Sequence, residues 1–117
     1  MKLVQVIDAD CCPPVLRSSL DEEEAGRLAA ALKVMADPAR LRLVSLIAAQ
    51  PGGEACQCDL THEIGLSQPT VSHHLRVLHE AGVLDREQRG RWAYYRIRSD
   101  PLRQLAQAIS PVTRRAS

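Results

Sequence analysis

The stretch from Ser67 to Leu78 constrains the fold of this chain more than any other segment, because its side chains divide into two helical stripes. Val71, Leu75 and Leu78 recur at the i, i+4, i+7 spacing of a face that a helix buries. The second stripe carries only hydrogen-bonding and charged side chains. This pattern predicts a helix that packs against a core by one face and offers the other face to a partner.

The polar stripe has the side chains that read base edges and contact phosphates in DNA. Ser67 is a favourable N-cap, and the free N–H groups of the first turn then attract anions. A shorter helix, expected from Cys56 to Ile64, ends at Gly65 just before this one. Two helices joined by a tight turn predict a DNA-binding helix-turn-helix. The candidate DNA-contacting residues on the second helix are Ser67, Gln68, Thr70, Ser72, His73 and Arg76.

Two further helices are expected before this pair. Ser19 and Glu22 form a capping-box pattern that opens a helix ending near Met35. Asp37-Pro38 supplies the N-cap and the first residue of the next helix, which the Pro-Gly-Gly sequence at 51–53 ends. The residues expected to face the core along these two helices are Leu28, Leu32, Met35, Leu41, Val44, Leu46 and Ile47.

After Gly82 the hydrophobic pattern changes from helical to alternating. Residues 83–87 and 92–97 are predicted to be strands joined by a turn at 88–91, which forms a hairpin wing. Ser99-Asp100-Pro101 is expected to cap a last helix. The apolar stripe of that helix is Leu102, Leu105, Ala106 and Ile109.

The expected fold class is therefore mainly α with a small β-hairpin wing, a winged helix-turn-helix. In so small a domain, terminal helices with apolar stripes are predicted to pack against a second copy and form a homodimer. Residues 1–18 are expected to be a flexible cysteine-containing arm, because the prolines after Cys11-Cys12 exclude a helix there. Residues 19–110 form the DNA-binding and dimerisation domain, and residues 111–117 are a frayed tail.

Length and charge fit this interpretation. The 117 residues suffice for one domain, and no apolar run approaches the ~20 residues of a membrane span. The N-terminal apolar segment is too short for a secretory signal, so a cytoplasmic location without membrane association is expected. Residues 1–63 carry a net charge of −4 and residues 64–117 carry +5, so the basic half holds the candidate reading helix. Arg89 and Arg91 in the wing are further candidate DNA contacts.

Four cysteines occur as two pairs, Cys11-Cys12 and Cys56-Gln57-Cys58. Disulfides are disfavoured in the cytoplasm, so metal binding or redox chemistry is expected of them. Thiolates are soft ligands that prefer thiophilic ions. Residues two apart point to different sides of a regular helix, so Cys56 and Cys58 are expected to chelate one ion only if the helix start is distorted. Ion binding would then displace the recognition helix.

Five segments occur in an order that matches a known family: they are DPARLR at 37–42, ACQCDL at 55–60, LSQPTVSHHL at 66–75, AGVL at 81–84 and RGRWAYY at 89–95. Together they resemble the ArsR/SmtB-type family of metal-sensing winged-helix transcriptional repressors, in its arsenic-responsive or cadmium/lead-responsive branch. The resemblance implies a homodimer that binds a palindromic operator in double-stranded DNA and leaves it when metal binds.

The resemblance also implies the metal ligands Cys11, Cys12, Cys56 and Cys58, within one subunit or across two. The vicinal pair favours As(III) or Sb(III) as the inducer, held by three thiolates, with Cd(II) or Pb(II) as the alternative. Zinc with four cysteines is chemically feasible. The zinc site on the last helix of some members has no counterpart here, because residues 101–107 contain no histidine.

The residues alone suggest two alternative functions. The first is a DNA-binding repressor switched by thiol oxidation. The second, an enzyme, is disfavoured, because His62 is the only base near a cysteine in the sequence and so short a chain offers no pocket-forming core.

Overall fold

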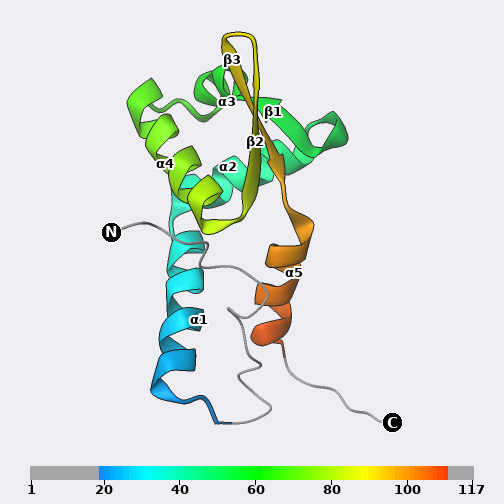
Figure 1. Cartoon of the computed structure of the whole chain (residues 1–117). Helices are drawn as coiled ribbons and strands as arrows, with labels where there is room; N and C mark the ends of the chain where they lie inside the picture. Colours follow the sequence, from blue (N-terminus) through cyan, green and yellow to red (C-terminus); the bar gives the residue numbers. More distant parts are fainter. Residues whose placement is uncertain (1–18, 111–117) are drawn as a thin grey trace.

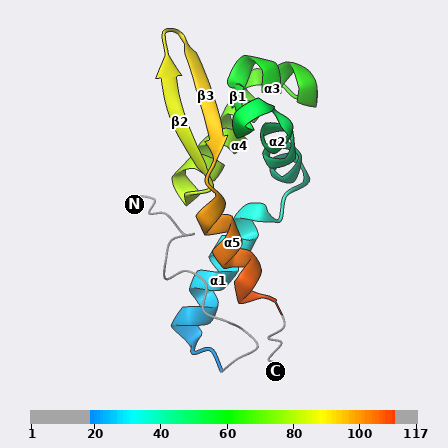
Figure 2. The same ribbon diagram turned by 90° about the vertical axis from the view of Figure 1, so that its right-hand side faces the viewer.

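The computed structural model describes residues 19–110, so the predicted arm with Cys11 and Cys12 and the predicted tail lie outside the described residues. Helices α2, α3 and α4 pack together with the hairpin beside them, and α1 and α5 lie side by side at the opposite end (Figures 1 and 2). In chain order the elements are α1 (Glu22–Met35), α2 (Pro38–Ala49), the 3₁₀ turn η1 (Pro51–Gly53), β1 (Glu54–Cys56), α3 (Gln57–Ile64), α4 (Gln68–Ala81), β2 (Leu84–Arg89), β3 (Trp92–Ile97) and α5 (Ser99–Ala108).

The helix starts follow from capping side chains, with one shift from the prediction. The capping box of α1 is Asp21 with Glu24, and the prediction of Ser19 with Glu22 is wrong. The Asp21 carboxylate accepts the Glu24 N–H at 2.7 Å, and Glu24 accepts the Asp21 N–H at 3.0 Å. Both pairs have the same spacing, and an ionised acceptor makes the stronger bond. Asp37 caps α2 as predicted, by accepting the Arg40 N–H at 3.1 Å.

The last helix does not have the predicted side-chain cap. Helix α5 already includes Ser99, and its N-cap residue Arg98 makes no side-chain capping bond. Pro101 is tolerated in the first turn because its missing N–H would have no partner within the helix.

The predicted hairpin is confirmed, with a tighter turn than expected. Strands β2 and β3 pair from Leu84↔Ile97 to Arg89↔Trp92, so only Gly90 and Arg91 connect them. Gly90 has a φ of 63°, a left-handed conformation that glycine adopts at little cost. Strand β1, which the sequence pattern did not predict, pairs antiparallel with β3 and makes the sheet order β1-β3-β2. Cys56 is therefore the last residue of a strand.

The core lies where α2, α3 and α4 meet the sheet. The predicted stripe Val71, Leu75 and Leu78 is fully buried. In α2, Leu43 is fully buried instead of the predicted Leu41, which is 50% exposed. The other fully buried large side chains are Ile47, Leu60, Val83 and Leu84.

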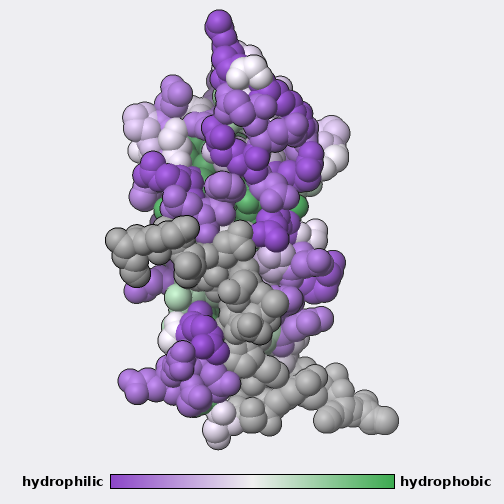
Figure 3. Space-filling view, viewed as in Figure 1, coloured by the Kyte–Doolittle hydropathy of each residue, from purple (hydrophilic) through white to green (hydrophobic). Residues whose placement is uncertain are grey.

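Parts of the apolar stripes of the terminal helices, which are expected to pack against a second copy, are exposed in the single chain. Leu32 of α1 is 36% exposed, Ile109 beyond α5 is 51% exposed, and Ala106 is also exposed, whereas Ala31 and Ala108 are buried. On the face of the molecule drawn in Figure 3, the surface over the wing is mostly hydrophilic. Within residues 19–110, none of the helices combines the length and the apolar character needed to cross a membrane.

Candidate nucleic-acid interface and thiol site

Helix α4 presents the expected polar side. Gln68, Thr70, His73 and Arg76 are exposed, while the apolar stripe of the same helix is buried. Ser67 is the N-cap and accepts the Thr70 N–H at 3.4 Å, as predicted. The structure thus brings these side chains together on one accessible helix face, the arrangement that a reading helix needs to enter a major groove.

Ser72 differs from the other candidates because its hydroxyl already has a protein partner. The Gln57 side-chain amide donates to the Ser72 Oγ at 2.5 Å, and both residues are half-buried. Gln57 stands between Cys56 and Cys58, so one side chain links the thiol segment directly to α4. Sequence reasoning missed this role. The position of a long amide side chain between two candidate ligands was the available signal.

A second link to α4 comes from Arg40 in α2. Its Nε donates to the Val34 carbonyl at 2.7 Å, and its Nη1 lies 3.2 Å from the His74 Nδ1. A guanidinium can only donate, so the His74 Nδ1 is the acceptor in this contact. Arg40 therefore joins the end of α1, the start of α2 and the middle of α4.

The two thiols of the CxC sequence lie together at the start of α3. Cys56 is 6% exposed, with φ −76° and ψ 141°, while Cys58 is exposed in the first helical turn. The pKa of the Cys58 thiol is raised, chiefly by its hydrogen-bonding interaction with Cys56 and then by burial. The predicted helix start at Cys56 is wrong, since α3 begins at Gln57. Because Cys56 is extended and precedes the helix, the two cysteines are not two residues apart on one regular helix.

These donors suit a thiophilic ion but do not complete a site by themselves. Within residues 19–110, no group of three or more Cys, His, Asp or Glu side chains is placed to hold a metal ion. The described part of the chain therefore supplies two soft donors, Cys56 and Cys58. The other two predicted ligands, Cys11 and Cys12, lie outside the described residues.

The two predicted wing arginines have different surroundings. Arg89 donates to Glu54 at 2.6 and 3.1 Å and to Glu87 at 2.7 Å, and its guanidinium lies 4.3 Å from the centre of the Tyr94 ring. Arg96 also donates to Glu54, at 2.8 Å. These hydrogen bonds from Arg89 and Arg96 lower the pKa of Glu54 to about 2. The charge of Arg89 is thus balanced by carboxylates.

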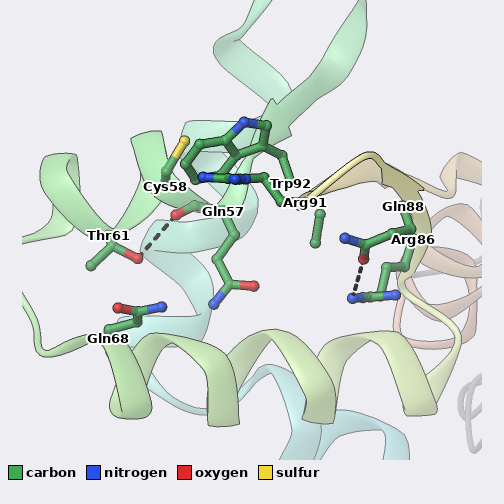
Figure 4. A pocket seen from close by; sticks show the side chains of 9 residues that line it. Gln57, Cys58, Thr61, Gln68, Arg86, Gln88, Arg91 and Trp92 are labelled. Atoms are coloured by element: carbon green, nitrogen blue, oxygen red, sulfur yellow. Dashed lines mark hydrogen bonds between the residues drawn. The ribbon is translucent and has the colours of Figure 1, made fainter.

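Arg91, by contrast, is exposed and makes no ion pair with any residue that the structure describes. Its side chain lies with Cys58 and Trp92 at one pocket between α3, the start of α4 and the wing (Figure 4). This cavity of about 400 Å³ forms between surface elements and not within the core. Its lining consists of Gln57, Cys58, Thr61, Gln68, Arg86, Gln88, Arg91, Trp92 and Ala93.

Known proteins are similar to this chain in sequence and in fold. The family model described as "Bacterial regulatory protein, arsR family" matches residues 37–86, from the cap of α2 into β2. The chain is 49% identical over 65 residues to the arsenic resistance transcriptional regulator ArsR1 of Pseudomonas putida. That match covers 56% of this chain and 49% of the relative, so the chain spans about half the length of that protein.

Two solved structures extend the likeness beyond the matched segment. The AntR antimony-specific transcriptional repressor is 32% identical, with a TM-score of 0.64 over 76% of this chain and 79% of the other. A homodimeric winged helix-turn-helix DNA-binding domain from Mycobacterium bovis is 26% identical, with a TM-score of 0.60 over 76% of this chain and 83% of the other. From the element order, the exposed reading helix and these matches, we conclude that the chain is a winged helix-turn-helix protein that belongs to the arsR family of bacterial regulatory proteins.

Proposed function

We propose that this chain is a transcriptional repressor that binds a palindromic operator as a homodimer and dissociates when As(III) or Sb(III) binds its cysteine thiolates. One observation carries the proposal: the adjacent free thiols of Cys56 and Cys58 flank Gln57, which is bonded to the candidate reading helix. Two proteins similar to the chain support it, since one is an arsenic resistance regulator and the other an antimony-specific repressor.

The DNA contacts follow from exposure and from free hydrogen-bonding capacity. On α4 we assign base or phosphate contacts to the exposed Gln68, Thr70, His73 and Arg76, with Ser67 at the helix start. Ser72 is a weaker candidate, because its hydroxyl is half-buried and already accepts from Gln57, which leaves its proton and one lone pair for DNA. In the wing, the uncompensated charge makes Arg91 a stronger candidate than Arg89.

The dimer is proposed to form through the terminal helices. Leu32 and Ile109 are large apolar side chains left 36% and 51% exposed on or next to α1 and α5. A second copy that covers them would bury apolar surface on both chains, and the similar M. bovis domain is homodimeric. A two-fold dimer presents two copies of α4, which matches a palindromic operator. A regulator of this kind would act in the bacterial cytoplasm, where the DNA is.

The inducer site is proposed to combine both cysteine pairs. Cys56 and Cys58 supply two thiolates, and Cys11 or Cys12 of the same or the partner subunit supplies the third that a pyramidal As(III) or Sb(III) centre needs. Cd(II) or Pb(II) is the alternative ligand, since either takes the same soft donors. A thiol oxidised to a disulfide or sulfenic acid is the alternative trigger without any ion.

Coupling to DNA is proposed to run through the residues next to the thiols. An ion held by Cys56 and Cys58 fixes the backbone of Gln57 and thereby the position of its amide against Ser72. Cys56 also pairs with Tyr94 in β3, so the same segment is part of the wing sheet. An ion shifts the DNA-binding equilibrium only if it prefers the conformation that does not fit the operator.

The test measures release of operator DNA. The reduced full-length chain first selects its duplex from a random-sequence pool, and fluorescence anisotropy then follows the labelled complex during separate titrations with arsenite, antimonite, Cd(II), Pb(II) and peroxide. We expect release at the lowest dose with arsenite or antimonite, and none in the variant with both Cys56→Ser and Cys58→Ser. Release by peroxide alone would favour the redox alternative. A complex that survives every addition would contradict the proposal.

A further inference from the structure

The pocket beside Cys58 has the side chains of an anion site. Its lining includes two arginines, Arg86 and Arg91, with three glutamines and a threonine, and it includes no carboxylate. Arg86 is held in place by its bonds to the Tyr95 hydroxyl at 3.2 Å and to Gln88 at 2.8 Å, whereas Arg91 is exposed. Arginine and neutral amides without an acidic partner are the groups that bind phosphate oxygens in protein–DNA interfaces.

The hairpin separates its charges between its two faces. Side chains alternate along a strand, so Arg86 and Gln88 of β2 lie on one face and Glu87 and Arg89 on the other. Of the carboxylates near the wing, Glu54 and Glu87 bond to Arg89, and Asp85 lies 3.7 Å from Arg98. The Asp59 carboxylate lies 4.0 Å from the Cys58 Sγ but does not line the pocket. The pocket lining therefore keeps two arginines without a carboxylate among its residues, while Arg89 on the opposite face of the hairpin is neutralised.

The pocket is continuous with the reading helix. Gln68, the first residue of α4, lines the pocket and also belongs to the exposed polar side of that helix. A DNA strand that leaves a major groove filled by α4 toward the wing would pass this pocket. Figure 4 shows Cys58, Arg91 and Trp92 gathered at one end of it, with the Gln57 and Gln68 side chains on the α3 and α4 side.

We propose that this pocket receives a backbone phosphate of the bound DNA, held by Arg91 and Arg86, and that a ligand on Cys58 occupies the same space. The inference rests on the proposed function and deepens it, because it makes the thiol ligand and the DNA backbone mutually exclusive at one pocket. An ion bound to the exposed Cys58 thiol, together with its other ligands, projects toward Arg91. It thereby blocks the approach of the phosphate. Release of the DNA then needs no rearrangement of α3 or α4, and the coupling through Gln57 acts in addition to this direct block.

The decisive test separates occupancy of the pocket from chelation. A variant with Cys11→Ser, Cys12→Ser and Cys56→Ser keeps only the Cys58 thiol, which cannot chelate an ion with a second thiolate of its own chain. Its thiol is alkylated with N-ethylmaleimide, which adds bulk without charge. Anisotropy is measured on the duplex that the unmodified wild-type chain selects from a random pool. The matched control also carries Cys58→Ser and receives the same reagent.

We expect alkylation to weaken DNA binding by at least about tenfold in the single-cysteine variant and to leave the control unchanged. The reciprocal result is also expected: saturating duplex slows alkylation of Cys58. Equal DNA affinity before and after complete alkylation, checked by mass, would overturn the inference.

A second measurement does not depend on the cysteine substitutions. Arg91→Ala in the otherwise native chain is expected to weaken DNA binding about tenfold and to reduce the slope of log affinity against log salt by about 2 per dimer, one phosphate for each subunit. Arg42→Ala is the control, since Arg42 is exposed on α2, away from the proposed dimer helices, and outside the pocket. An unchanged slope for Arg91→Ala would overturn the phosphate assignment.

The two proposals fail in different ways. If the native chain selects no duplex from the pool, the proposed function fails and the inference falls with it. If the chain binds DNA and arsenite releases it, but alkylation of Cys58 and Arg91→Ala both leave binding unchanged, only the shared pocket is refuted.

Discussion

Replacing Arg40 with alanine tests the packing that holds the reading helix in place. The Arg40 side chain is only 15% exposed and its charge lies near Asp37, at 3.8 Å. It donates to the Val34 carbonyl at the end of α1 and to the His74 ring on α4. Alanine would leave that carbonyl and the His74 Nδ1 without their donor.

The magnitude follows from these two bonds. A hydrogen bond from a charged donor contributes about 1.5–3 kcal/mol, so the pair amounts to about 3–6 kcal/mol. Freeing the arginine rotamers returns up to about 2 kcal/mol, and water reaches part of the vacated site. We therefore expect Arg40→Ala to lower the free energy of unfolding by about 2–3 kcal/mol. Arg40→Lys should lower the free energy of unfolding by less than Arg40→Ala does, since an ammonium replaces one of the two donors at best.

Urea unfolding followed by circular dichroism provides the measurement, at one fixed chain concentration because association adds to apparent stability. Arg42→Ala is the matched control on the same helix, where the side chain is exposed, and its effect should stay within about 0.5 kcal/mol. A loss for Arg40→Ala no larger than that of the control would refute the role given to the Arg40 bonds.

Three further predictions concern DNA, the arm and acid stability. Arg76→Ala should weaken operator binding without changing arsenite uptake, and an unchanged band-shift affinity would remove Arg76 from the interface. Replacing Cys11 and Cys12 with serine should lower the affinity for arsenite or alter the ion ranking, so identical titrations would show the arm to be irrelevant. Glu54 has its pKa lowered from 4.5 to about 2 by Arg89 and Arg96, so its bonds stabilise the fold above pH 4.5 and lose this effect as the pH falls toward 2. Glu54→Gln should therefore unfold in urea with a weaker pH dependence over that range, and parallel curves for both proteins would contradict this.

Patterns of neighbouring residues predicted most of the helices and strands. The stripe of Val71, Leu75 and Leu78, the caps Asp37 and Ser67 and the hairpin all depend on residues close in sequence, and the structure confirms them. Where two local patterns competed, spacing alone did not decide. Ser19 and Asp21 both precede a glutamate by three residues, and the carboxylate is the cap that forms.

The missed features depend on distant partners. Strand β1 has only three residues, too few to show an alternating pattern, and it exists because β3 pairs with it from some forty residues further along the chain. The same pairing places Cys56 in a strand, so the two cysteines do not both lie within α3 as expected. The bond from Arg40 to His74 and the salt bridge from Arg89 to Glu54 likewise join segments that no local pattern relates.

The sequence offered candidate donors and candidate DNA contacts, but not the geometry in which they lie. The donor types at 56 and 58 and the polar side of α4 could be identified from residue identity alone. The pocket that lies between them could not, because it is enclosed by the start of α3, the first residue of α4 and the wing, three elements that only the folded chain brings together.

X-ray absorption at the arsenic edge tests the central claim most directly. The full-length chain is loaded with arsenite under reducing conditions, and the sulfur neighbours of arsenic are counted in the native chain and in the variant with Cys56→Ser and Cys58→Ser. We predict arsenic bound to three sulfur atoms in the native chain and to fewer in the variant. The same sulfur count in both proteins, or only oxygen neighbours in the native chain, would contradict the assignment of the inducer to these two thiols.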